Sequence, residues 1–137
     1  MKLIFCLDDK NGMMFNGRRQ SQDKLLRSRV LSIVGNNKLV MSPYSAKQFT
    51  EGESIITSDD PQRIAESEDF YFVEDRPFSI ENADEIIIYR WNRHYPADVK
   101  FDHNIKDLGF VLYYTYEFEG SSHEKITEER YKKGDGF

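Results

Sequence analysis

This sequence has a single cysteine and no long hydrophobic run, and each scarcity excludes a class of protein. The one cysteine among 137 residues, Cys6, cannot form an internal disulfide, which argues against a disulfide-stapled extracellular domain. No apolar run approaches the roughly 20 residues that a membrane-spanning helix requires. The N-terminus also lacks the charged segment and apolar core of a secretory signal. We therefore expect a cytoplasmic protein that does not associate with a membrane.

Histidine is also scarce, and basic residues are fewer than acidic ones. The only histidines are His94, His103 and His123, and their spacings match no zinc or iron signature, so no metal site is expected. Nineteen basic residues against 24 acidic ones give a net charge of -5, which disfavours nucleic acid as a partner because its phosphates would be repelled. The sequence contains no internal repeat, low-complexity tract or linker. We expect one domain over residues 1–137.

Aromatic residues are abundant, and they favour strands. Eight tyrosines and ten phenylalanines make up most of the 14% aromatic fraction. A chain of this length can bury about two thirds of the surface that its unfolded form exposes, so it needs no staple. Strands are predicted at residues 3–7, 38–41, 53–57, 70–73 and 85–91, and helices at residues 21–34, 43–49 and 61–66. Residues 11–17 are predicted to form a loop.

The C-terminal part of the chain predicts an antiparallel hairpin. Residues 109–119 and 123–132 are two long β-like runs, joined by Gly120-Ser121-Ser122. Ser121-Ser122-His123 lacks the context of a nucleophile elbow and is interpreted as the hairpin tip. The short elements before the hairpin favour parallel strands joined by crossovers. The predicted fold class is α/β, with a mostly parallel central sheet, flanking helices and this hairpin.

Several motifs, taken in chain order, resemble the dihydrofolate reductase family. An early strand and loop with the pair Asn16-Gly17 precede a helix whose first turn carries Asp23, as in the family's active-site loop and pterin-binding helix. Ala83-Asp84 introduces the triple-isoleucine strand as it introduces the family's late strand, and residues 98–102 resemble the acidic-aromatic segment that follows. The hairpin, with Glu128-Glu129-Arg130-Tyr131, also fits. The resemblance implies a dihydrofolate reductase-like domain.

The resemblance also implies a small-molecule site near Asp23, the position of the acid that contacts the pterin. The alternative for Asp23 is an ordinary acid in the first turn of a helix, which the helix dipole favours. Met14 and Phe15 match the hydrophobic tip of the family's active-site loop. The arginines before the helix are expected either to bind an anion at its N-terminus or to be solvated. No catalytic residue is predicted, and the expected ligand-binding residues are Phe5, Met14, Phe15, Arg18, Arg19, Asp23 and Leu26.

Two departures from the family argue against a dinucleotide cofactor. The family binds cofactor phosphates on a Gly-Arg turn after the second strand and on a Gly-Gly pair after a central strand, where backbone amides approach the anion. This sequence has Ser42-Pro43-Tyr44 at the first place and Val73-Glu74-Asp75 at the second. Proline lacks an amide donor, and two carboxylates repel a pyrophosphate. No cofactor is therefore expected, and an active NADPH-dependent reductase is disfavoured.

Two interpretations of function stay open. The first is a small-molecule cleft near Asp23; the second is an acidic module, of the antitoxin or immunity protein type, that covers a basic protein partner. Acidic stretches at residues 59–60, 66–69 and 74–75 suit the second. The segment 18–23 also resembles small bacterial proteins loosely labelled ribonuclease Z. The chain lacks the histidine-rich loop of metallo-hydrolases, however, so a metal-dependent nuclease is not expected.

Overall fold

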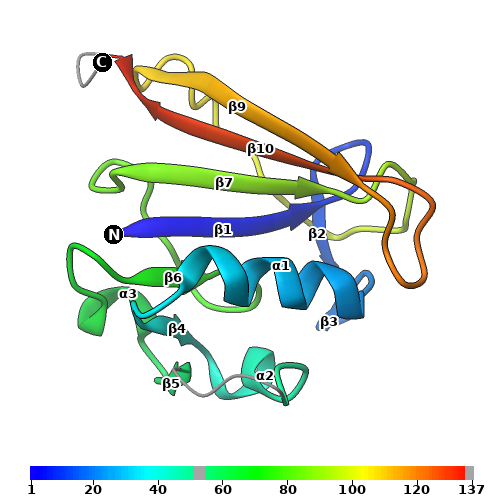
Figure 1. The fold of residues 1–137 in the computed structure, drawn as a ribbon, viewed down its shortest axis with the longest axis horizontal. Coiled ribbons are helices and arrows are strands. Elements are labelled where there is room, and N and C mark those ends of the chain that lie inside the picture. Colours follow the sequence, from blue (N-terminus) through cyan, green and yellow to red (C-terminus); the bar gives the residue numbers. More distant parts are fainter. Residues whose placement is uncertain (51–54, 135–137) are drawn as a thin grey trace.

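The computed structural model describes residues 1–50 and 55–134, and its main feature is a seven-stranded sheet (Figure 1). The order across the sheet is β5 (Ile55–Thr57), β4 (Leu39–Met41), β6 (Phe70–Phe72), β1 (Lys2–Leu7), β7 (Glu85–Arg90), β10 (Ile126–Lys133) and β9 (Phe110–Phe118). Strands from β5 to β7 are parallel. β10 runs antiparallel to both β7 and β9. The predicted α/β class and the antiparallel C-terminal hairpin are confirmed.

A second, three-stranded sheet lies beyond the end of β1. It contains β3 (Arg18–Arg19), β2 (Gly12–Phe15) and β8 (Val99–Lys100), in that order. The prediction of a loop over residues 11–17 is wrong, because β2 and β3 form a hairpin. Asn16 and Gly17 have φ angles of 52° and 71°, the left-handed conformation that a two-residue hairpin turn of type I′ requires at both positions.

The longest helix described, α1 (Lys24–Val34), packs on one face of the main sheet (Figure 1). Leu26, Val30 and Val34 are buried and recur at intervals of four residues, so they lie on one side of the helix. The helix ends at Gly35, whose φ of 58° is in the left-handed region that glycine adopts without strain. The predicted start at Ser21 is wrong, because the cap is two residues later.

Two short helices complete the described elements. α2 (Pro43–Ala46) and α3 (Pro61–Ile64) both have proline in the first turn, where its missing amide costs nothing. Asp60, the residue before α3, makes no side-chain capping bond. Of the strand predicted over residues 53–57, the first two residues lie outside the described part of the chain. No helix in the described residues is long and apolar enough to cross a membrane.

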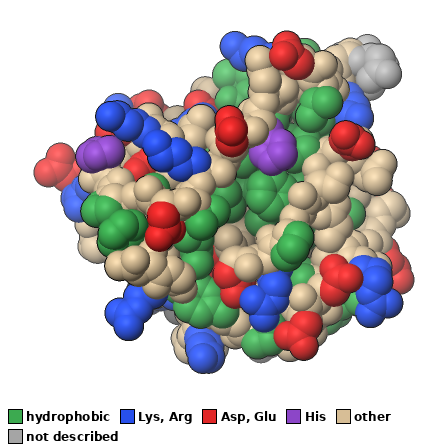
Figure 2. All heavy atoms as spheres, turned by 180° about the vertical axis from the view of Figure 1, so that it is seen from behind, with side chains coloured by type: hydrophobic (Ala, Val, Ile, Leu, Met, Phe, Trp, Pro, Cys, Tyr) green, Lys and Arg blue, Asp and Glu red, His purple; other side chains and the backbone are tan. Residues whose placement is uncertain are grey.

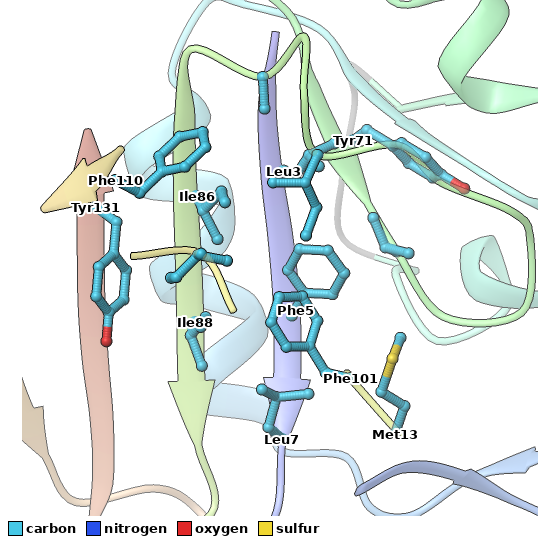
Figure 3. Close-up of a cluster of buried hydrophobic side chains, with 14 of the residues drawn as sticks. Leu3, Phe5, Leu7, Met13, Tyr71, Ile86, Ile88, Phe101, Phe110 and Tyr131 are labelled. Carbon is cyan, nitrogen blue, oxygen red and sulfur yellow. The ribbon is translucent and has the colours of Figure 1, made fainter. Parts of the chain in front are cut away.

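The main sheet has a hydrophobic core on each face, and β7 contributes to both. Ile87 faces the core beneath α1, whereas Ile86 and Ile88 face the opposite core. Consecutive isoleucines are therefore buried on both sides, as expected for a strand in a covered sheet. The face opposite α1 is covered by loops and the β2–β3 hairpin, which contribute Phe101 and Met13 to the cluster drawn in Figure 3.

Candidate functional site

Asp23 is the N-cap of α1 and is almost fully buried, with 2% of its surface exposed. Its Oδ1 accepts hydrogen bonds from the backbone amides of Leu25 at 2.9 Å and Leu26 at 3.1 Å. The first amides of a helix have no partner within the helix, and a capping carboxylate supplies one. This bonding explains why the helix begins at Lys24.

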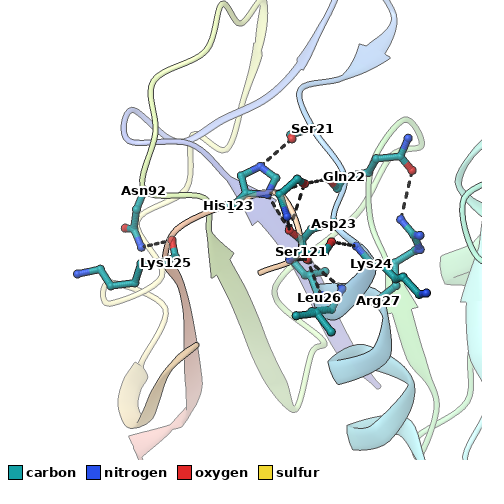
Figure 4. A network of polar contacts seen from close by, with 12 residues as sticks. Ser21, Gln22, Asp23, Lys24, Leu26, Arg27, Asn92, Ser121, His123 and Lys125 are labelled. Atoms are coloured by element: carbon teal, nitrogen blue, oxygen red, sulfur yellow. Dashed lines mark hydrogen bonds and ion pairs between the residues drawn. The ribbon is translucent and has the colours of Figure 1, made fainter. Parts of the chain in front are cut away.

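The same carboxylate binds the loop between β9 and β10 (Figure 4). The amides of Ser121 and Ser122 donate to its two oxygens at 3.0 and 2.9 Å, and His123 Nδ1 lies 2.8 Å from Oδ2. Gly120 makes the close approach possible: a Cβ there would lie 2.4 Å from Asp23 Oδ2. The loop between the two strands is therefore docked on the start of α1.

His123 extends this network to a hydroxyl group. Its Nε2 lies 2.8 Å from Ser21 Oγ and 3.3 Å from the Tyr95 hydroxyl, and its ring stacks on Trp91 with 4.5 Å between centroids. Because the Asp23 carboxylate is an acceptor, we assign the proton to Nδ1, which leaves Nε2 as the acceptor for the Ser21 hydroxyl. Asp23, His123 and Ser21 thus form a continuous acid–imidazole–hydroxyl chain.

The carboxylate at the buried end of this chain is stabilised in its ionised form. Burial by itself would raise the pKa of Asp23, but hydrogen bonds from His123, from the loop amides and from Leu26 outweigh burial and hold that pKa well below its usual range. Asp23 therefore remains an acceptor at neutral pH and keeps the His123 ring in one orientation.

Ser121-Ser122-His123 lie in the loop of the β9–β10 hairpin, as predicted, but this loop is docked on the protein. His123 is 4% exposed, and the loop amides are bonded to Asp23. No spacing rule could have joined these residues, because Asp23 and His123 are 100 positions apart. Gly120 is the nearest local signal, because glycine lets the backbone approach another group closely, but in the sequence it fits a hairpin turn equally well.

An apolar pocket of about 450 Å³ opens on the face of the sheet opposite α1. In Figure 2, which shows that side of the molecule, hydrophobic side chains gather in the middle, and most charged groups lie toward the edges. The pocket lies between the β2–β3 hairpin and the segment that follows β6. Its lining residues are Met13, Met14, Gly17, Glu74, Asp75, Arg76, Pro77, Phe78, Val99 and His103.

A second pocket, also of about 450 Å³, lies against the β2–β3 hairpin and is more polar. Gln20 and Tyr95 line this polar pocket, and they adjoin the acid–imidazole–hydroxyl chain: Gln20 precedes Ser21, and the Tyr95 hydroxyl contacts His123. Its lining residues are Phe15, Asn16, Arg18, Arg19, Gln20, Tyr95 and Pro96.

The structure does not gather all the residues expected to bind a ligand. Phe5 and Leu26 are buried in the cores on opposite faces of the sheet. Met14 lines the apolar pocket, and Asp23 is enclosed by its hydrogen-bond donors. The three residues that do share one pocket are Phe15, Arg18 and Arg19.

The side chains of Glu74 and Asp75, which follow β6, bond to residues that follow β4. Glu74 accepts two hydrogen bonds from the Arg19 guanidinium, at 3.0 and 3.2 Å between the closest atoms, and one from Ser45 Oγ at 2.8 Å. Asp75 accepts a hydrogen bond from Ser42 Oγ at 2.6 Å. In open α/β sheets, ligands commonly bind in the crevice outside the carboxyl ends of the strands. Here that space holds paired side chains, with Arg19 on Glu74 and Arg76 on Asp75.

Metal ligands do not cluster in the described part of the chain. No group of three or more histidine, cysteine, aspartate or glutamate side chains is arranged there to hold a metal ion.

Comparison with known proteins identifies the fold. No protein-family model matches this chain, and no curated protein matches its sequence. Its structure is similar to that of a dihydrofolate reductase from Enterococcus faecalis, solved in complex with NADP(H) and RAB-propyl. The TM-score is 0.69, with 98% of this chain and 96% of that chain covered, at 12% sequence identity. The predicted dihydrofolate reductase-like fold is confirmed; at this identity the likeness concerns the fold alone.

Proposed function

We propose that this protein binds a small, largely apolar molecule in the apolar pocket and does so without a dinucleotide cofactor. The observation that carries the proposal is the pocket itself. Its volume of about 450 Å³ is within the range of small-molecule sites, and most such sites combine apolar walls with a few polar groups. Met13, Met14 and Phe78 form apolar walls, and Arg76 and His103 supply polar groups.

Phe78, which lines the pocket, belongs to an aromatic cluster with Phe5 and Phe101. Phe78 stacks on Phe101 with an interplanar angle of 1°, and Phe5 meets both rings edge-on at centroid distances of 5.0 and 4.7 Å. The methionines in the lining are flexible and polarizable, so they adapt to ligands of different outline. This combination suits a flat aromatic ligand with one hydrogen-bonding group.

The paired carboxylates at the strand ends support the absence of a dinucleotide. The reductase from Enterococcus faecalis was solved with NADP(H). In this chain Glu74 is bonded to Arg19, and Asp75 to Ser42, so these groups occupy the ends of β4 and β6. A pyrophosphate entering there would have to break these hydrogen bonds.

An acidic surface for a basic protein partner has less support. Arg76 pairs with Asp75 at 2.8 Å and with Asp59 at 3.5 Å, while Arg19 pairs with Glu74. Asp69, in another acidic stretch, is buried. Much of the negative charge in these stretches is therefore neutralised within the chain.

Blocking the pocket tests the proposal. A library of small aromatic fragments is screened by ligand-observed NMR against the wild type and two tryptophan variants. Val99 lines the pocket and is 47% exposed, and Val111, on β9, is 50% exposed and does not line it. We expect fragments that bind the wild type and Val111→Trp but not Val99→Trp. The proposal fails if no fragment binds the wild type, or if Val99→Trp binds the same fragments equally well.

A further inference from the structure

We propose that Ser21, His123 and Asp23 form a nucleophilic site that hydrolyses small carboxylic esters entering from the polar pocket. Ser21 Oγ and Asp23 Oδ2 each lie 2.8 Å from a different nitrogen of the His123 ring. This is the connectivity in which an imidazole removes the hydroxyl proton while a carboxylate orients the ring, and it recurs on unrelated folds. The inference does not depend on the apolar pocket.

The three groups differ in exposure as such chemistry requires. The side chains of His123 and Asp23 are 2% and 0% exposed, whereas Ser21 is half-buried. Ser21 lines a small cavity of about 10 Å³ together with Gln20, and Gln20 also lines the polar pocket. The carboxylate is held by four backbone amides in addition to His123, so it does not rotate away. The ring is held by its stacking on Trp91. The acid and the base are thus fixed, and the nucleophile borders solvent.

Tyr95 supplies a second hydroxyl beside the reacting oxygen. It lies 3.3 Å from His123 Nε2, which has one lone pair, and Ser21 lies closer, at 2.8 Å. When Ser21 donates to that lone pair, the Tyr95 hydroxyl is free to donate to another acceptor. We assign it to the carbonyl oxygen of the ester, where negative charge develops in the transition state.

The reaction balances without a cofactor. Ser21 Oγ attacks the ester carbonyl carbon as its proton passes to His123 Nε2, and that proton then goes to the departing alkoxide as the carbon–oxygen bond breaks. Water attacks the resulting acyl-serine, gives a proton to Nε2, and releases the carboxylic acid. The same proton returns to Ser21 Oγ, which restores the starting state.

Covalent labelling tests the nucleophile. The protein is treated with a fluorophosphonate probe, its intact mass is measured, and the labelled peptide is sequenced by mass spectrometry. We expect one adduct, on Ser21, in the wild type, and none in Ser21→Ala or His123→Gln. Ser28→Ala is the matched control, because Ser28 is an exposed serine on α1 that lies outside this network. This variant should be labelled like the wild type.

Hydrolysis of p-nitrophenyl acetate supplies the second measurement. We expect Ser21→Ala to lower the rate at least 100-fold, in line with the roughly 10²–10⁴-fold contribution of a positioned base and nucleophile, while its circular dichroism spectrum and Tm match the wild type. Tyr95→Phe should lower the rate about 10-fold or more and still label on Ser21. Failure to label the wild type, or labelling that persists in Ser21→Ala, overturns the proposal. An unchanged rate in Tyr95→Phe removes Tyr95 from the site.

Discussion

At the scale of single residues, Asp23 joins parts of the chain that no local interaction links. Its oxygens cap α1 and also bind the loop between β9 and β10. A hydrogen bond to a charged group is worth about 1.5–3 kcal/mol, more than one between neutral groups. Because the carboxylate is buried, removing its charge would leave several donors without a strong acceptor. Asp23 therefore stabilises the fold whether or not it also takes part in chemistry.

The acid stability of the protein should depend on Asp23. Its pKa is lower in the folded protein than its unfolded value of about 3.9. The carboxylate therefore stabilises the fold fully above that value, and the stabilisation is lost as the pH falls through the folded pKa. We expect Asp23→Asn to lower the free energy of unfolding at pH 7 by about 1–3 kcal/mol, and to flatten its decline below about pH 4. Urea denaturation at a series of pH values measures both.

The control for this experiment is Asp107→Asn, which changes an exposed acid on a loop. It should leave the profile of unfolding free energy against pH close to that of the wild type. Equal profiles for the Asp23 and Asp107 variants would show that the Asp23 network contributes nothing to stability.

Among the elements, β7 contributes side chains to both hydrophobic cores. It pairs with β1 on one side and β10 on the other, so it joins the parallel part of the sheet to the C-terminal hairpin. Its isoleucines alternate between the two cores. By contrast, β9 pairs only with β10 among the described strands and exposes Val111, Leu112 and Tyr113 by 38–50%.

Hydrogen exchange should separate these two strands. We expect the amides of residues 86–89 in β7 to be among the slowest and to exchange only through global unfolding, because both neighbouring strands must separate to expose them. The outward amides of β9 should exchange faster by sub-global opening. Native-state exchange followed by NMR checks the order. If β7 exchanges as fast as the edge strand, it is not the element that holds the two cores together.

Considered as a whole, the molecule has a dihydrofolate reductase-like sheet, and paired side chains occupy the ends of its strands β4 and β6. Glu74 and Asp75 follow β6, and Ser42 and Ser45 follow β4 and bond to them. These bonds tie neighbouring parallel strands together beyond their last backbone pair. Paired side chains therefore occupy the space directly beyond the ends of β4 and β6, where such sheets commonly bind a ligand.

NADPH should therefore not bind to this protein. Titration of NADPH, followed by the quenching of Trp91 fluorescence and by calorimetry, should show no saturable binding in the micromolar range. The physical reason is the cost of breaking the Glu74 and Asp75 hydrogen bonds. An authentic dihydrofolate reductase run in parallel supplies the positive control. Saturable micromolar binding would mean that the ends of β4 and β6 open readily.

The local patterns of the sequence determined most of the element order. Consecutive isoleucines in residues 86–88 predicted a strand covered on both faces, and the spacing of Leu26, Val30 and Val34 predicted a helix with one buried side. The order of these elements, with the late hairpin, was enough to predict the fold. Such patterns can be found in a sequence because the buried residues of one helix or strand recur at that element's own period.

The grouping of the polar side chains depends on tertiary packing. Phe5 and Leu26 were expected in one site, but β1 and α1 bury them in different cores. Asp23 and His123 meet across 100 positions, and the Asn-Gly turn at residues 16–17 folds the expected loop into a hairpin between two pockets. The physical reason is that periodicity is a property of one segment, whereas a hydrogen-bond network or a pocket depends on distances between segments, which only the packed chain defines.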